Sequence, residues 1–246
     1  MGKSWKNPIK EAMAQKKGAL FTKLAREIAV AAKLGGPDPE ANSRLKLAVA
    51  AAREVSCPKD TIERAIKKGS GQLDDGEQIE ELTYEGYGPH GVGVIVECQT
   101  DNKNRTVSEI RSLFKYHGGN MGETGAVIWM FDRVSWIEAL TNKALGSFDP
   151  EEEAIEVGAN EVEAPAGEDS DSDKDQGIFS FYGAPEDLDS IRSSLSERGW
   201  QIRKAELSFK PKNITDLSEE QKQEVVALLE ELEDNEDSHR VYATIN

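Results

Sequence analysis

The side chains that could carry chemistry are scattered along this sequence of 246 residues. Three histidines, His90, His117 and His239, lie too far apart to predict a metal triad or a nucleophile paired with a base. Ser43 and Lys46 match a Ser-x-x-Lys pattern, but they fall inside a helical pattern that lacks the companion motifs of such enzymes. The sequence therefore gives no support to an enzyme, and we expect no cofactor, no metal and no small-molecule substrate.

Two further stretches resemble ligand sites only in part. The glycine cluster at residues 84–93 precedes an extended pattern and lacks the Gly-Lys-Ser/Thr of a phosphate-binding loop, so it predicts a tight turn. The acidic run 168–175 alternates Asp residues, but its sixth and twelfth positions are not the Gly and Glu of a calcium loop. We interpret residues 149–175 as a solvated connection.

A polar run, Thr100 to Thr106, lies between an extended and a helical pattern. An ordinary loop is one interpretation, with Asn104 as the cap of the following helix. The run is also dense in hydrogen-bonding groups, and Asn102, Asn104 and Arg105 would suit contacts with phosphate or RNA at a helix start. We predict that these three residues form a secondary nucleic-acid contact.

The charge is distributed unevenly along the chain. The formal net charge is −16, yet residues 1–70 hold 15 basic and 7 acidic side chains, whereas residues 71–246 hold 15 basic and 39 acidic ones. A basic segment of net +8 joined to an acidic body favours a nucleic-acid-facing module, although a solvated lysine-rich surface remains an alternative. The cations that we predict to pair with phosphates are Lys16, Lys17, Lys23, Arg26, Lys33, Arg64, Lys67 and Lys68.

Helical periodicity dominates the basic segment. Apolar residues recur at spacings of three and four, and the predicted helices cover residues 8–34, 42–55 and 58–68. Lys67 and Lys68 fall on the outer side of the third helix, opposite its apolar stripe. Residues 1–79 are therefore predicted to form a small basic helical domain.

From residue 80 the pattern alternates between strands and helices. The first group is predicted as strands 82–85, 92–100 and 126–131 with a helix over 105–117. The second group is predicted as strands 134–139, 161–164, 178–182 and 200–209 with helices 151–157 and 186–198. This second group has the β-α-β-β-α-β order of ferredoxin-like folds.

A last helix over 218–233 and strand over 240–245 lack partners of their own, so we assign them to the first group. The expected fold class is α+β, with a helical bundle and two ferredoxin-like α/β domains, the third domain inserted in the second. The predicted domains are residues 1–79, residues 80–133 with 213–246, and residues 134–212.

The sequence resembles the YebC/PmpR family along its whole length. The motifs that carry the resemblance are Gly2 to Asn7, Phe21 to Leu24, Arg26 to Ile28, Ala31 to Gly36, Pro58 to Gly69, Tyr84 to Pro89 and Thr100 to Thr106. The chain departs from the family in lacking the histidine of the usual opening and in carrying His90 where a glycine is common. The resemblance implies the same three-domain organisation.

The resemblance also implies a function in gene expression. Members are described as probable transcriptional regulators that bind DNA, whereas others, including mitochondrial relatives, act on translation at the ribosome. We therefore expect a non-enzymatic nucleic-acid-binding regulator of gene expression that resembles DNA-binding transcriptional regulators, with promoter DNA or ribosomal RNA as its partner. The alternatives are a ribosome-associated translation factor that binds ribosomal RNA and a protein-binding adaptor.

Composition limits the cellular location. No apolar run approaches the length of a membrane span, and the first residues are followed by no export-signal core. Cys57 and Cys98 show neither a CxxC spacing nor a nearby histidine cluster, which is typical of a reducing compartment. We expect a cytoplasmic protein that does not interact with membranes.

Overall fold

A computed structural model describes residues 7–73, 79–141, 148–164 and 177–245, without the side chains of residues 7–16. The chain forms two compact units: Met1–Met130 with Pro211–Asn246, and Phe131–Lys210. The second unit therefore interrupts the first in the sequence. The acidic run 168–175 and most of the opening motif, residues 2–6, lie outside the described residues.

Three helices open the first unit: α1 (Asn7–Gly35), α2 (Ser43–Glu54) and α3 (Lys59–Gly69). Their apolar stripes meet in one core, which contains Ile28, Ala31, Leu45, Ala52, Ile62 and Ala65. Gly69 lies so close to the backbone of Ala29 that any side chain would overlap the carbonyl of that residue. The end of α3 can therefore lie directly against α1 only because residue 69 is glycine.

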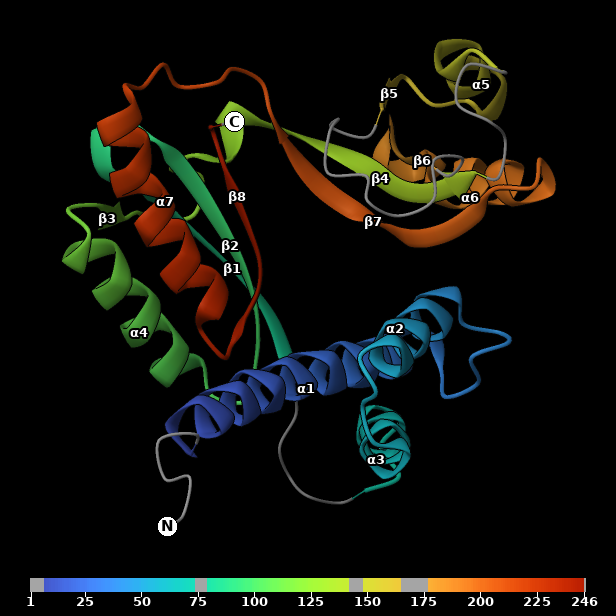
Figure 1. Cartoon of the computed structure of the whole chain (residues 1–246), viewed down its shortest axis with the longest axis horizontal. Helices are drawn as coiled ribbons and strands as arrows, with labels where there is room; N and C mark the ends of the chain where they lie inside the picture. The colour runs from blue at the N-terminus through green and yellow to red at the C-terminus, as the bar shows by residue number, and fades with distance from the viewer. Residues whose placement is uncertain (1–6, 74–78, 142–147, 165–176, 246) are drawn as a thin grey trace. The chain divides into compact units, whose positions relative to one another are not determined.

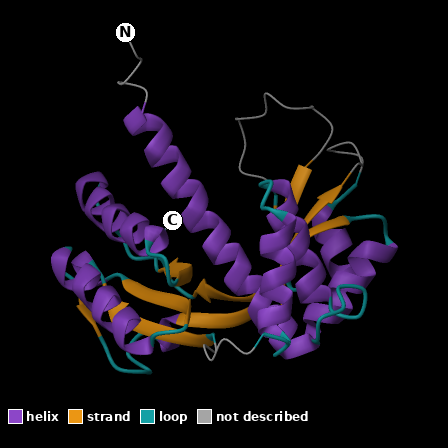
Figure 2. Ribbon diagram, turned by 90° about the horizontal axis from the view of Figure 1, so that it is seen from below, coloured by secondary structure: helices purple, strands orange, loops and turns teal. Residues whose placement is uncertain are grey.

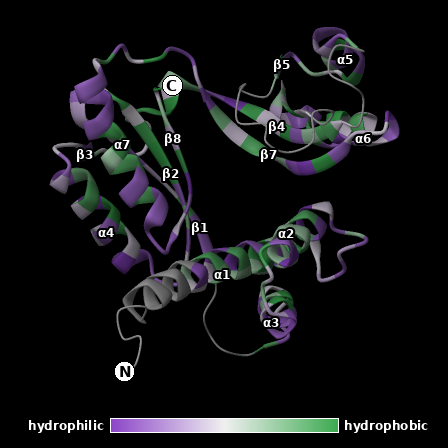
Figure 3. Ribbon diagram, viewed as in Figure 1, coloured by the Kyte–Doolittle hydropathy of each residue, from purple (hydrophilic) through white to green (hydrophobic). Residues whose placement is uncertain are grey.

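The same unit contains a four-stranded antiparallel sheet in the order β3-β1-β2-β8. The strands are β1 (Glu80–Tyr87), β2 (Gly93–Thr100), β3 (Asn120–Met121) and β8 (Ser238–Ala243). Helices α4 (Lys103–Tyr116) and α7 (Glu219–Asp234) cover one face of the sheet (Figures 1 and 2). Alternate residues of β2 meet these helices in the core, and the hydrophobic stretch of β2 is visible in Figure 3.

The connectivity of this first sheet differs from the ferredoxin-like order expected for it. Strands β1 and β2 are neighbours in both sequence and space, from Glu80 opposite Thr100 to Tyr87 opposite Gly93. They are joined by a single turn of 3-10 helix, Pro89–Gly91, so no α-helix separates them. The predicted tight turn is present. His90 adopts φ 60° there, a left-handed conformation that glycine adopts most easily.

The strand predicted over residues 126–131 is wrong, because Ile128–Met130 forms a 3-10 turn and β4 begins at Phe131. The buried carboxylate of Glu85 accepts hydrogen bonds from the backbone N–H groups of Gly125, Val127 and Ile128 at 2.7, 2.8 and 2.8 Å. These amides consequently have a side-chain acceptor instead of a neighbouring strand.

The second unit has the predicted β-α-β-β-α-β order, with its strands arranged as β5-β6-β4-β7. Its elements are β4 (Phe131–Thr141), α5 (Pro150–Val157), β5 (Glu161–Glu163), β6 (Gly177–Gly183), α6 (Leu188–Glu197) and β7 (Gln201–Pro211). Trp200 packs edge-on against Phe148, Phe179 and Phe181, with ring centroids 5.1 to 5.6 Å apart. This unit is ferredoxin-like.

The molecule is therefore an α+β protein, as the sequence predicts. Among the described residues, no helix is both long enough and apolar enough to cross a membrane. Both cysteines are buried free thiols.

Candidate nucleic-acid interface

The third helix presents its cations to solvent. Ile62 and Ala65 face the helical core, and this places Arg64 and Lys67 on the exposed side. Within the described part of the chain, neither Arg64 nor Lys67 forms an ion pair. Lys68, predicted to lie outside with them, is instead half-buried. Two cations of α3 are thus available for a polyanion.

The outer cations of α1 are Lys17 and Lys33. The Nζ atom of Lys17 lies 5.4 Å from the centroid of the Phe21 ring. The Nζ atom of Lys33 donates to the carbonyl oxygen of Ile79 at 3.2 Å. Both side chains remain exposed, so these weak contacts still allow a phosphate partner. The side chain of Lys16 lies outside the described residues.

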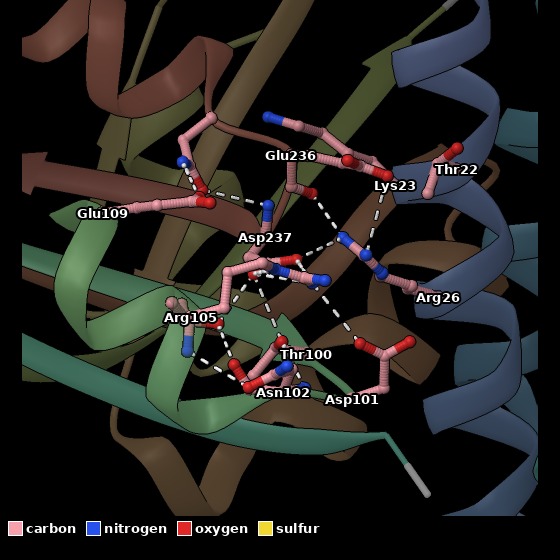
Figure 4. Close-up of polar contacts among 12 residues, drawn as sticks. Thr22, Lys23, Arg26, Thr100, Asp101, Asn102, Arg105, Glu109, Glu236 and Asp237 are labelled. Carbon is pink, nitrogen blue, oxygen red and sulfur yellow. Dashed lines mark hydrogen bonds and ion pairs between the residues drawn. The ribbon is translucent and has the colours of Figure 1, made fainter. Parts of the chain in front are cut away.

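Arg26, by contrast, points into the first unit (Figure 4). Its side chain is 11% exposed, and its Nη1 atom lies 3.0 Å from Oδ1 of Asp237, which precedes β8. Arg105, from the start of α4, reaches the same carboxylate, with Nη2 at 3.0 Å from Oδ1. One carboxylate thus holds two of the arginines that we predicted to bind phosphate.

Asp237 is held as a buried anion. Its side chain is 1% exposed, and it accepts hydrogen bonds from the hydroxyls of Thr106 at 2.7 Å and Thr100 at 3.2 Å. Burial alone would raise the pKa of this carboxyl, but the Thr106 and Arg105 hydrogen bonds and the charge of Arg26 together hold the pKa below its ordinary value. The cluster joins α1, β2 and α4 within the first unit.

Lys23 is also turned toward this region. Its Nζ atom donates to the carbonyl oxygen of Glu233 at the end of α7. Burial lowers the pKa of this amine, against the opposing effect of the nearby carboxylates of Asp234 and Glu233. Lys23 is therefore half-buried and bonded to the protein, unlike the exposed cations of α3.

The polar run after β2 caps a helix, but through a different residue from the one predicted. The Oδ1 atom of Asn102, not of Asn104, accepts from the backbone N–H of Arg105 at 3.1 Å. Asn104 lies inside α4 with an exposed side chain. The cap of α4 also places Arg105 beside Asp237, so this loop has a structural role of its own.

A second charged cluster joins α1 to the sheet. Arg44 forms two hydrogen bonds to the carboxylate of Glu27, at 2.8 and 3.0 Å. Gln99 donates to the same carboxylate at 2.7 Å, and Nε2 of His239 lies 3.3 Å from it. Burial, the main cause, lowers the pKa of His239 to about 4, so this imidazole is neutral at neutral pH.

Sequence reasoning did not identify Asp237 or Glu27 as important residues. Asp237 is separated from Arg105 by 132 positions and lies in an acidic stretch with the appearance of an ordinary solvated turn. Its pairing with two arginines depends on the tertiary fold. Among the described residues, no group of three or more His, Cys, Asp or Glu side chains is arranged to hold a metal ion.

Comparison with known proteins identifies the family. Residues 3–72 match the TACO1/YebC protein N-terminal domain, and residues 79–245 match the TACO1/YebC second and third domain. A probable transcriptional regulatory protein of Bdellovibrio bacteriovorus is 62% identical, over 100% of both chains. Another from Desulfosudis oleivorans is 46% identical, over 95% of this chain and 90% of its own.

A solved structure supports the same assignment. The crystal structure of a conserved hypothetical protein from Aquifex aeolicus matches with a TM-score of 0.78 and 42% identity, covering 94% of this chain and 90% of that one. The predicted family resemblance is confirmed in both the helical and the α/β segments, and this chain belongs to the TACO1/YebC family.

Proposed function

We propose that the protein is a non-enzymatic regulator of gene expression that binds nucleic acid through the exposed cations of α1 and α3. The observation that carries this proposal is the solvent-facing position of Arg64 and Lys67 on a segment of net +8. Lys17 and Lys33 on α1 are further exposed cations of this segment. Phosphate contacts of this kind provide affinity and orientation without reading sequence.

Promoter DNA is the target that we favour. The relatives described above carry the name probable transcriptional regulatory protein, which supports a role in transcription. Ribosomal RNA is the alternative target, because phosphate-binding cations attract either nucleic acid. We further propose that the protein acts in the cytoplasm, in keeping with its two free cysteines.

The acidic second unit would orient the complex. Residues 131–210 hold 19 acidic and 8 basic side chains. Several of its cations already have carboxylate partners: Lys210 lies 2.6 Å from Glu161, and Arg198 lies 2.6 Å from Glu153. A net negative surface repels phosphates, so this unit would face away from the nucleic acid.

The test compares two charge reversals in the full chain. Lys67→Glu combined with Lys68→Glu should abolish retention of a promoter-length duplex in filter binding. Arg111→Glu combined with Lys115→Glu, two exposed cations of α4, is the matched control and should retain binding. Ribosome co-sedimentation at the same salt concentration separates the two targets. Wild-type affinity in a well-folded Lys67/Lys68 variant would contradict the proposal.

A further inference from the structure

Exposed aromatic side chains gather at the end of β1, where the turn that precedes β4 meets the first sheet. Trp129 is 63% exposed, Ile128 is 41% exposed and Tyr87 is 37% exposed, and we call these three side chains the aromatic patch. Within the described part of the chain, neither ring has an aromatic or a cationic partner. Exposed tryptophan and tyrosine in one cluster are typical of an interaction surface.

Hydrogen bonds hold both rings of the patch in fixed positions. The Oη atom of Tyr87 and the Nε1 atom of Trp129 donate to the same acceptor, the carbonyl oxygen of Ala126, each at 3.0 Å. The turn that carries this carbonyl is itself fixed by the buried Glu85, whose carboxylate accepts three of the backbone N–H groups of the turn. Gly125, at φ 93°, supplies the left-handed conformation that the turn requires. Because the rings are held in advance, a ligand loses little affinity to their ordering.

A carboxylate belongs to the same turn. The backbone carbonyl of Glu123 accepts the N–H of Ala126 at 3.0 Å, which places Glu123 in the turn that carries Trp129. The side chain of Glu123 is exposed and forms no ion pair among the described residues. Lys212 also reaches this region, and its Nζ atom donates to the backbone carbonyl of Trp129 at 3.0 Å. Glu123 therefore adds a negative charge beside the rings.

This combination favours a cationic ligand over a nucleic acid. The α/β part of the first unit, residues 80–130 and 211–246, holds 17 acidic and 7 basic side chains, so it attracts cations and repels phosphates. Aromatic rings bind cations over their faces, and tryptophan does so best. Arginine fits better than lysine, because its planar guanidinium can stack on a ring and also donate to a carboxylate. A purely apolar ligand would leave Glu123 unpaired.

We propose that the aromatic patch and Glu123 bind an arginine side chain from a basic segment of a partner protein. The guanidinium stacks on Trp129, the more exposed ring, and Glu123 balances its charge. Tyr87 and Ile128 provide apolar surface for the aliphatic stem of the arginine. This inference is independent of nucleic-acid binding through α1 and α3, because it uses other residues of the first unit.

The test uses the full chain and a fluorescent peptide of alternating arginine and glycine, with binding measured by fluorescence anisotropy. Trp129→Leu removes the ring but keeps an apolar side chain, and Glu123→Gln removes only the charge. The matched controls are Tyr116→Leu, at an aromatic position on α4 that is 80% exposed, and Glu220→Gln, at an exposed position on α7. Thermal melts establish that each variant is folded. Two comparison peptides carry lysine, or the uncharged arginine analogue citrulline, in place of arginine.

The arginine peptide should bind the Trp129→Leu variant about fivefold more weakly than the wild type, or weaker still. Glu123→Gln should weaken binding by a smaller factor and should also reduce its salt dependence, because it removes one exposed charge. Both controls should bind as the wild type does. The lysine peptide should bind more weakly than the arginine peptide, and the citrulline peptide should show no measurable binding.

Equal affinity of the wild type and Trp129→Leu for the arginine peptide would show that the acidic surface attracts the peptide without the aromatic patch, and the proposal would be wrong. Absence of binding by the wild type, or binding of the citrulline peptide as tight as that of the arginine peptide, would also overturn it. If Trp129→Leu instead weakens binding of an adenine single strand and leaves peptide binding unchanged, the patch stacks bases and the proposal is wrong.

Discussion

The inner side of α1 and the outer side of α3 carry the same kinds of side chain but use them differently. Arg26 and Lys23 on α1 are bonded to Asp237 and to the carbonyl of Glu233. Arg64 and Lys67 on α3 face solvent, with no ion pair in the described part of the chain. A count of basic residues therefore overestimates the number that can reach a phosphate. Substitutions on the two sides should change different properties of the protein.

The largest effect is expected at the inner side. Asp237→Ala leaves the charges of Arg26 and Arg105 without their buried partner, which should lower the free energy of unfolding by about 3 to 5 kcal/mol. Asp189→Ala, which removes the exposed partner of Arg192 at 3.1 Å, is the control and should cost about 1 kcal/mol or less. Urea denaturation of both variants measures the difference. Equal losses would show that the Asp237 cluster contributes no more than a surface pair.

The second effect is a pH dependence of the free energy of unfolding. It arises at the buried contact between Glu27 of α1 and His239. The pKa of His239 is about 4 in the folded protein and 6.5 when unperturbed, so the unfolded state binds a proton that the folded state excludes between these values. The free energy of unfolding should therefore fall by about 3 kcal/mol as the pH falls from 6.5 to 4. Urea denaturation across this range measures it.

Asp237 extends the loss of stability to lower pH. Because its folded pKa is depressed, its contribution is present above the ordinary value of 3.8 and is lost as the pH falls below it. His239→Asn should flatten the profile between pH 6.5 and 4 while leaving this more acidic decline. A wild-type profile that is flat over the upper range would argue against a buried neutral imidazole.

The third and smallest effect distinguishes two neighbouring asparagines. Asn102→Ala removes the cap of α4 and should lower the free energy of unfolding by about 1 kcal/mol. Asn104→Ala removes an exposed side chain within the helix and should have little effect. Thermal melts of the two variants decide between these positions. A larger loss of stability in Asn104→Ala than in Asn102→Ala would indicate that Asn104 caps α4, as the sequence predicted.

Much of the fold is predictable from local pattern. The apolar spacing of α1 to α3 reflects burial that is repeated at every turn of a helix. The alternation in β6 reflects burial that is repeated at every second residue of a strand. The prediction of a strand over 126–131 was wrong although these residues favour strands. The carboxylate of Glu85, about 40 positions earlier, accepts hydrogen bonds from backbone N–H groups of this segment. Local propensity carries no information about such a distant acceptor.

The candidate site was predictable only in part. Arg64 and Lys67 were placed correctly on the outer side of α3, because helical periodicity fixes which side faces the core. Arg26 and Arg105 belong to equally basic patterns, and their pairing with Asp237 arises from the tertiary fold.

The salt dependence of nucleic-acid binding tests the central claim most directly. Affinity of the full chain for one duplex is measured over a series of salt concentrations, for the wild type and for Arg64→Gln combined with Lys67→Gln. The logarithm of the wild-type affinity should fall linearly with the logarithm of salt concentration, and the variant should lose roughly 0.7 to 0.9 of slope per phosphate contact removed. A slope identical to that of the wild type, or a wild-type affinity independent of salt, would contradict the account.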